Sequence, residues 1–142
     1  MVGGKNSKEC IIFTLTANMD GTIKLKPLVI NKSLKLKAFS HKHVKNPNNL
    51  GIHWYANPKA WMNGVVWEKF LQKFDVDMIC HGRKQFILMV DNAPGHICEH
   101  LPLKVTKIVW LSPNTTGRFQ PMDAGIIKSF KSQYKKLLLK RI

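Results

Sequence analysis

The longest uninterrupted apolar stretch in this chain of 142 residues is the five-residue run Phe86–Val90. A membrane-spanning helix needs about 20 apolar residues, so this run is far too short to cross a bilayer. It shows no alternation of apolar and polar side chains, a pattern typical of a strand covered on both faces in a parallel α/β sheet. We therefore predict such a strand over Gln85–Val90, ending at Asp91, and a second one over Lys107–Leu111.

Two β-rich stretches in the N-terminal part predict a β-hairpin. They are Cys10–Ala17 and Thr22–Ile30, and Asn18–Gly21 supplies the turn between them. Pro27 has no N–H to donate to a sheet, so it indicates either a bulge or a second strand that lies at an edge. The segment Lys32–Asn57, rich in asparagine, is predicted to be a long basic connection.

Two helices are predicted from apolar residues at helical spacing. The first has two competing starts: Asn57–Pro58 would place Gly64 inside the helix at a cost of about 1 kcal/mol, whereas Asn63 as N-cap places Gly64 in the first turn. We prefer the start at Asn63. In the second, apolar residues between Ile126 and Arg141 follow a 3.6-residue period with lysines between them, which predicts a terminal amphipathic helix with a basic outer face.

Charge is the most unusual part of the composition. Twenty-three Lys and Arg stand against eight Asp and Glu, a formal net charge of +15, while the apolar content of 44% is ordinary for one globular domain. From Gly21 to Trp67 there are eight lysines and no acid, and after Glu99 there are nine basic residues and a single acid, Asp123. Scattered lysines usually form only a solvated surface, but an imbalance this large favours a polyanionic partner.

The cysteine count argues against a disulfide framework. Three cysteines, Cys10, Cys80 and Cys98, are an odd number, so we predict free buried thiols in a reducing compartment. The histidines of His41–His43 and His96–His100 do not have the spacing of a closed four-ligand site, and zinc is not expected.

Two carboxylates occupy positions where chemistry is common. Asp91 follows a predicted strand, and ligands of open α/β sheets bind beyond the carboxyl ends of strands, whereas Asp123 precedes the predicted terminal helix. Each has a structural alternative, because an Asp after a strand can organise a turn and an Asp before a helix can cap it. Together they could share a divalent cation, since Mg²⁺ in phosphoryl chemistry is held by one or two carboxylates and phosphate oxygens.

Three segments stand in order along the second half of the chain: Val90–His96, Leu111–Thr116 and Gln120–Lys131. Together with Ala17–Thr22, Lys26–Ile30 and Ala60–Met62, they resemble the DDE transposase domain of the pogo and Tigger group. Domesticated relatives of that group include centromere protein B and the jerky proteins. The resemblance covers nearly the whole chain.

The resemblance implies a ribonuclease H-like mixed sheet with flanking helices, in which three acidic residues hold two Mg²⁺ or Mn²⁺ ions for DNA strand cleavage and transfer. Asp91 matches the second acid and Asp123 the third, with 31 residues between them. The first acid should lie on an opening strand upstream of the hairpin, where Glu9 is the sole acid; Asp20 occupies the hairpin turn. Neither Glu9 nor Asp20 is expected to be catalytic, so we expect weak metal binding and little cleavage.

The same resemblance implies a partial domain over residues 1–142, without the opening strand and without the family's N-terminal helix-turn-helix region. In the ribonuclease H-like sheet that strand lies between the hairpin and the strand ending at Asp91. Its loss would leave two rows of backbone donors and acceptors without partners. We therefore expect this chain alone to be metastable, or to close the gap by a different pairing.

Three hypotheses remain for function. The first is a transposase-derived DDE endonuclease-like domain that binds DNA in the nucleus and is catalytically incomplete in this chain. The second is a non-catalytic DNA-binding module that uses its basic surface, and the third is a decaying element copy without a role. No membrane and no small-molecule cofactor are expected, and no oligomeric state is predicted.

Several residues outside the two acids are candidates for supporting roles. For Arg83 and Lys84 a solvated loop is as good an interpretation as a phosphate contact, and for His96 a structural hydrogen bond is as good as a contact to DNA or metal. Asn92 is a possible supporting residue beside His96. The residues expected to contact nucleic acid are Arg83, Lys84, Arg118, Lys128 and Lys131.

Overall fold

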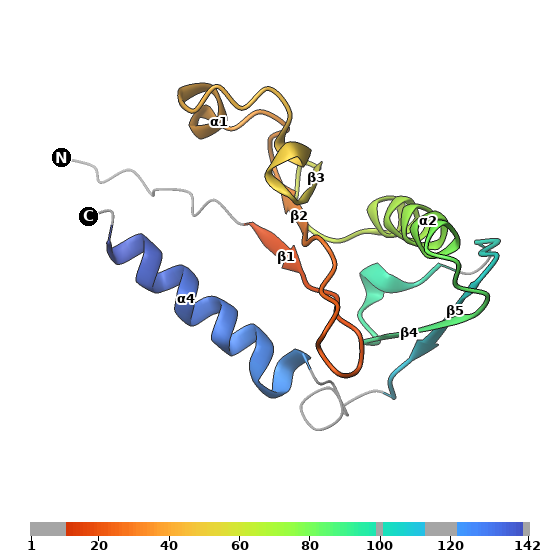
Figure 1. Cartoon of the computed structure of the whole chain (residues 1–142). Coiled ribbons are helices and arrows are strands. Elements are labelled where there is room, and N and C mark those ends of the chain that lie inside the picture. Colours follow the sequence, from red (N-terminus) through yellow and green to blue (C-terminus); the bar gives the residue numbers. More distant parts are fainter. Residues whose placement is uncertain (1–10, 99–100, 113–121, 141–142) are drawn as a thin grey trace. The chain divides into compact units, whose positions relative to one another are not determined.

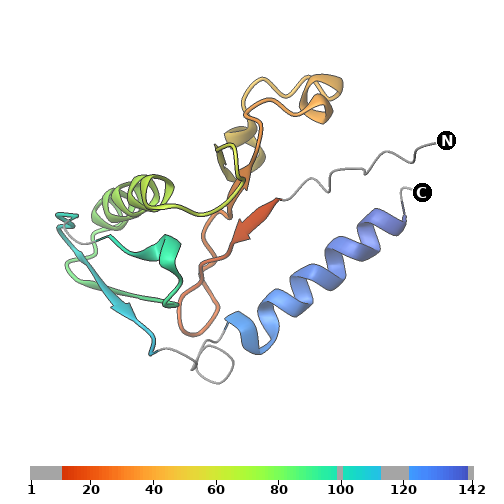
Figure 2. The ribbon, with the colours of Figure 1, turned by 180° about the vertical axis from the view of Figure 1, so that it is seen from behind.

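The structure is a computed structural model that describes residues 11–98, 101–112 and 122–140. The chain divides into two units, Met1–Met62 and Asn63–Ile142, and each is described by itself. Both contain helices and strands (Figures 1 and 2), so the predicted α/β class is confirmed. In the described part of the chain, no helix is long and apolar enough to cross a membrane.

The first unit is built on a three-stranded sheet in the order β1–β2–β3. β1 (Ile12–Thr14) pairs antiparallel with β2 (Leu28–Asn31), which pairs in parallel with β3 (His53–Ala56). All four residues of β2 are buried. The edge position considered for this strand is therefore wrong: β2 is central, and Pro27 is tolerated because it precedes the strand, where no ladder N–H is required.

The predicted hairpin is confirmed, and its turn is held by side chains as well as backbone. The N–H of Asn18 donates to the carbonyl of Ile23 at 3.0 Å, and Gly21 has a φ of +71°, a conformation that favours glycine. Asp20 Oδ1 accepts hydrogen bonds from the Thr22 backbone N–H at 3.0 Å and from its hydroxyl at 2.7 Å. The hydrogen bond from the backbone N–H of Thr22 is the main cause that lowers the pKa of Asp20. Asp20 therefore organises this turn as a carboxylate.

The prediction of a plain connection over Lys32–Asn57 is wrong. The segment contains a short helix α1 (Lys37–His41), a 3₁₀ turn η1 (Pro47–Leu50) and strand β3. A parallel pair such as β2 and β3 needs a crossover, and α1 and η1 lie within it. A five-residue helix without buried residues and a four-residue strand leave no clear periodic signal in the sequence.

The second unit begins with α2 (Gly64–Cys80), and the preferred N-cap is confirmed. The side chain of Asn63 accepts a hydrogen bond from the N–H of Val66 at 3.0 Å. The predicted apolar stripe is buried, and Phe74 meets Phe86 of the following strand edge-on with ring centroids 5.4 Å apart. This contact places α2 against the sheet of the second unit.

That sheet consists of the parallel strands β4 (Phe86–Val90) and β5 (Thr106–Trp110), close to the predicted ranges. Leu88 and Val90 are buried, whereas Ile87 and Met89 are 62% and 59% exposed. The prediction that β4 is covered on both faces is therefore wrong for the described residues, because α2 packs on one face and the side chains alternate.

The remaining elements are the 3₁₀ turn η2 (Pro94–His96), the π-helical turn η3 (Met122–Ile126) and α4 (Ile127–Leu139). The predicted terminal helix is confirmed in α4, although no residue of it is buried among those described. Cys80 is exposed, so the prediction of a buried thiol is wrong there, and Cys98 is half-buried. Sheets with flanking helices of this kind are consistent with the ribonuclease H-like fold that the resemblance implies.

Candidate functional site

Asp91 lies directly after β4, at the carboxyl end of the strand, as predicted. Its side chain is 28% exposed, and its Oδ1 accepts a hydrogen bond from Nδ1–H of His96. Among the described residues, no donor reaches the other oxygen, Oδ2. The carboxylate is therefore fixed in orientation, while its other oxygen meets no donor from residues 11–98, 101–112 and 122–140 and could bind a cation.

His96, which supports Asp91, is itself held from three sides. Its backbone N–H donates to the carbonyl of Ala93 at 2.9 Å within η2. Its ring lies 4.6 Å from the ring of Trp67 on α2, and its carbonyl accepts from the indole N–H of Trp110 on β5 at 3.4 Å. The structural interpretation of His96 is therefore supported by contacts with α2 and β5.

The helical spacing of the apolar residues on α2 predicts that Trp67 is a core residue. The side chain is indeed buried, but it also forms the surface on which the imidazole of His96 rests. The partnership of Trp67 and Trp110 with His96 leaves no local signal, because the three residues lie on separate elements.

Asp75 was missed by sequence reasoning and organises the start of β5. It is 5% exposed, and its carboxylate accepts backbone N–H bonds from Lys104 at 2.8 Å, Val105 at 3.1 Å and Thr106 at 2.9 Å. Burial raises the pKa of Asp75, but the hydrogen bonds outweigh burial and hold it below the ordinary value. An acid four residues after the buried Leu71, on the apolar face of α2, is the signal that could have revealed it.

Asp123 lies in η3, shortly before α4 begins. Its side chain is outside the described residues, as are Glu9 and Arg118, so the pairing of Asp91 with Asp123 stays a prediction. Asn92 follows Asp91 and is exposed.

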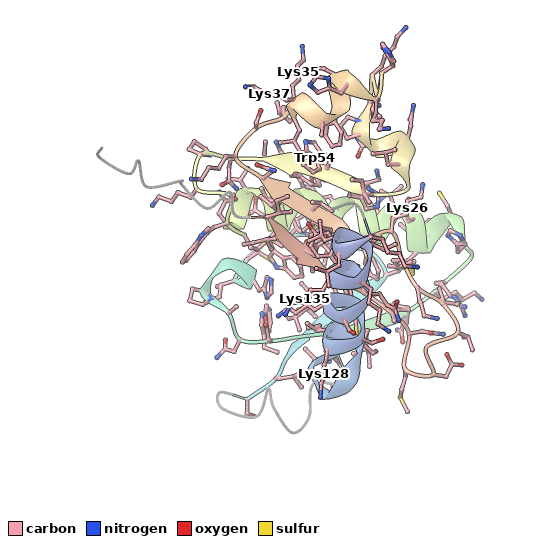
Figure 3. All side chains as sticks on the ribbon, turned by 90° about the vertical axis from the view of Figure 1, so that its left-hand side faces the viewer. Lys26, Lys35, Lys37, Trp54, Lys128 and Lys135 are labelled. Carbon is pink, nitrogen blue, oxygen red and sulfur yellow. The ribbon has the colours of Figure 1, made fainter. Side chains whose placement is uncertain are left out.

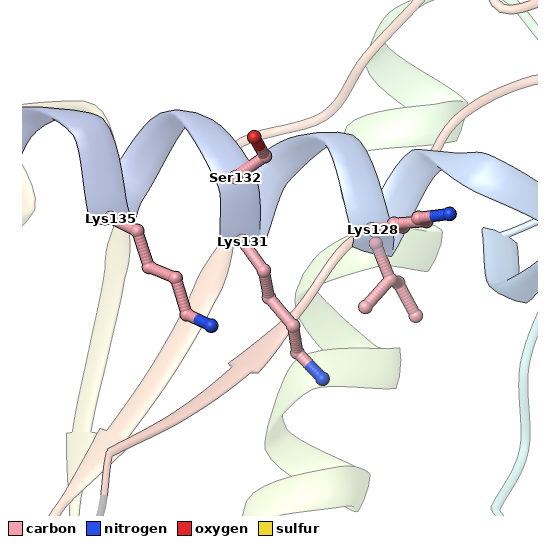
Figure 4. A pocket seen from close by; sticks show the side chains of 5 residues that line it. Lys128, Lys131, Ser132 and Lys135 are labelled. Atoms are coloured by element: carbon pink, nitrogen blue, oxygen red, sulfur yellow. The ribbon is translucent and has the colours of Figure 1, made fainter.

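The described basic side chains that are predicted to contact nucleic acid lie at two places in the second unit. Arg83 and Lys84 are exposed in the loop between α2 and β4. On α4, Lys128 and Lys131 line a pocket together with Lys135, which sequence reasoning had not singled out (Figure 4). Positions 128, 131 and 135 share one helix face and span about 10 Å, a length in which one DNA strand carries about three phosphates.

The donor set was tested for a divalent metal. The available oxygen of Asp91 is the kind of hard ligand that Mg²⁺ or Mn²⁺ takes, so this residue fits such an ion. Within the part of the chain that the structure describes, no group of three His, Cys, Asp or Glu side chains could hold a metal ion. The described residues thus supply one carboxylate, to which Asp123 would add a second.

Comparison with known proteins gives a consistent result. The profile of the family described as DDE superfamily endonuclease matches residues 8–142. Tigger transposable element-derived protein 4 of Mus musculus is 32% identical over 138 residues, covering 97% of this chain and 26% of the relative. ARS-binding protein 1 of Schizosaccharomyces pombe is 31% identical over 136 residues, covering 91% of this chain and 25% of the relative.

A third relative, Major centromere autoantigen B of Homo sapiens, is 26% identical over 125 residues, covering 88% of this chain and 19% of the relative. The chain thus spans about a quarter or less of the length of these relatives. No solved structure matches it significantly.

Proposed function

Because the chain belongs to the DDE superfamily endonuclease family, in its pogo and Tigger group, we propose that it is a DNA-binding domain built around a phosphodiester site. One relative is named as derived from a Tigger transposable element, and another is named as ARS-binding. A net charge of +15 supports the same partner, since binding to a phosphate backbone is largely electrostatic. A DNA partner also implies a nuclear location, and no small-molecule cofactor is proposed.

The observation that carries the proposal is the carboxylate of Asp91, fixed by His96 at the end of β4 with Oδ2 available. Asp91 and Asp123 would hold Mg²⁺ or Mn²⁺, which when bound would activate an attacking water or 3′-hydroxyl and stabilise the leaving oxygen. The contribution of His96 is to orient Asp91. The side chains proposed to neutralise phosphates are Arg83, Lys84, Arg118, Lys128 and Lys131.

A second candidate function is non-catalytic DNA binding. It is favoured by one observation: Lys128, Lys131 and Lys135 line one pocket on α4, and lysines contact phosphates without a metal. Family ancestry gives the metal-dependent chemistry. We expect this chain to perform little of it, because its sequence supplies matches to two acids of that family, Asp91 and Asp123. Under both candidates the basic surface binds DNA.

The test compares the chain with Asp91→Asn in three measurements: Mn²⁺ binding by calorimetry, duplex binding by fluorescence anisotropy, and nicking of supercoiled plasmid. We expect weak Mn²⁺ binding that Asp91→Asn abolishes, unchanged duplex binding, and no nicking by either protein. Asn keeps the size of the side chain, so folding is preserved and the effect reports the charge.

Each contrary outcome overturns a named part of the proposal. Equal Mn²⁺ binding by both proteins would remove Asp91 from the metal site. Robust nicking that Asp91→Asn abolishes would show that the site is complete. Absence of duplex binding at low salt would overturn the DNA partner itself.

A further inference from the structure

We propose that the first unit carries a DNA-binding surface of its own, separate from the acids of the second unit. This surface, the lysine arm, is formed by five lysines of the crossover between β2 and β3. The inference rests on the proposed DNA binding and adds where much of it occurs. The residues of the lysine arm are Lys32, Lys35, Lys37, Lys42 and Lys45.

The charge of the arm is unopposed. All five lysines are exposed, two histidines lie among them, and the sequence contains no acid between Gly21 and Trp67. Within the described residues, no carboxylate forms an ion pair with any of the five. The lysines of α2 differ, because Lys69 and Lys73 share their helix with Glu68 and Asp77.

The arm is also held in a defined conformation by one side chain of β3. The indole N–H of Trp54 donates to the carbonyl of Leu34 at 3.1 Å, and the ring meets Phe39 of α1 edge-on at 5.0 Å. The backbone N–H of Trp54 donates to Asn48 Oδ1 at 3.0 Å. Three separate parts of the crossover are thus fixed to one buried tryptophan, beyond which Lys35 and Lys37 project (Figure 3). A surface ordered in advance loses less entropy on binding.

The arm's electrostatics disfavour its own folding. α1 begins at Lys37, has no acid in its first turn, and its N-cap Leu36 provides no side-chain hydrogen bond. Positive charge near a helix start and lysines crowded together both destabilise the folded form. A bound polyanion would relieve this repulsion, and this is the physical reason to assign the arm a ligand.

The composition of the arm favours DNA over an acidic protein. Protein interfaces have apolar or aromatic centres, whereas here the aromatic rings, Phe39 and Trp54, are turned to each other at the base. Exposed lysines suit contacts to backbone phosphates, which are independent of sequence.

The experiment measures duplex binding of the full chain by anisotropy between about 50 and 200 mM salt, a range over which phosphate contacts change affinity strongly. The arm variant is Lys35→Gln, Lys37→Gln, Lys42→Gln and Lys45→Gln combined. The matched control removes the same charge from the second unit, as Lys69→Gln, Lys73→Gln, Lys104→Gln and Lys107→Gln.

We expect the arm variant to make the slope of log K against log salt shallower by about 3.6, since each of the four lost phosphate contacts contributes about 0.9. The control should change the slope by less than about 1. The melting temperature of the arm variant without DNA should be unchanged or higher, because repulsion is removed. A purely structural role for these lysines would lower it.

The outcomes separate this inference from the proposed function. A wild-type chain that does not bind DNA would overturn both. If the wild type binds DNA but the arm variant and the control lose equal affinity, the inference fails while the proposed function stands. Polyglutamate that competes as well as DNA of equal charge would show that the arm binds acidic polymers generally, and would overturn the assignment to DNA.

Discussion

Two aspartates of the second unit show how the surroundings of a carboxylate decide its role. The oxygens of Asp75 accept three backbone N–H bonds in a buried position, so they serve the fold. Asp91 is partly exposed and, among the described residues, has one oxygen bound to His96 and one available. Saturation with backbone donors indicates a structural anchor, and an oriented but open oxygen indicates a ligand.

Replacement of Asp75 with Asn should lower the free energy of unfolding by about 2 kcal/mol, because buried charge-assisted hydrogen bonds are replaced by weaker ones. Urea denaturation measures this change. Glu68→Gln, which removes an exposed charge from the same helix, should have little effect. An equal loss in both variants would contradict the anchoring role of Asp75.

The pH dependence of stability follows from the direction in which the fold shifts the pKa of Asp75. The pKa of Asp75 in the folded protein lies below its ordinary value of 3.8. Its contribution to the free energy of unfolding is therefore fully present above pH 3.8 and is lost as the pH falls through the folded pKa. The stability difference between wild type and Asp75→Asn should therefore be constant near neutral pH and shrink below about pH 4.

At the scale of elements, the sequence was most informative where the signal is local. Asn63 caps α2 through a residue three positions away, and the hairpin turn closes within six residues of sequence, so both could be predicted. β3 and α1 depend on contacts of Trp54 with residues up to 20 positions away, which no local pattern reveals. The same holds for the site. The position of Asp91 can be predicted from the strand that precedes it, whereas the packing of His96 on Trp67 can be seen only in the folded structure.

Hydrogen exchange on β4 should alternate along the strand. The N–H of Phe86 donates to Val105 and the N–H of Leu111 donates to Val90, so in this parallel register the amides of Leu88 and Val90 point toward β5. Those of Ile87 and Met89 point to the other edge, where no strand pairs with β4 among the described residues. Leu88 and Val90 should exchange slowly and Ile87 and Met89 rapidly, as NMR would resolve.

Equal protection of all four amides would contradict this pattern and show that another strand occupies the outer edge of β4.

At the scale of the whole molecule, basic surface is present on both units. The lysine arm belongs to the first unit, and the lysines of α4 belong to the second, which also carries Asp91. Only eight acids stand against 23 Lys and Arg, so most of the basic side chains have no acid to balance them. The resulting net charge of +15 attracts any polyanion that approaches. DNA affinity should therefore be shared between surfaces and should not be confined to the surroundings of the two acids.

This sharing predicts additive salt slopes. Lys128→Gln, Lys131→Gln and Lys135→Gln combined should make the slope of log K against log salt shallower by about 2.7, because each of the three lost phosphate contacts contributes about 0.9. Combined with the arm variant, the loss should be the sum of the two, because contacts without shared partners contribute independently. Anisotropy titrations of the four proteins measure this. A combined slope equal to that of the arm variant alone would show that α4 makes no phosphate contacts, and would remove Lys128 and Lys131 from the proposed DNA-binding residues.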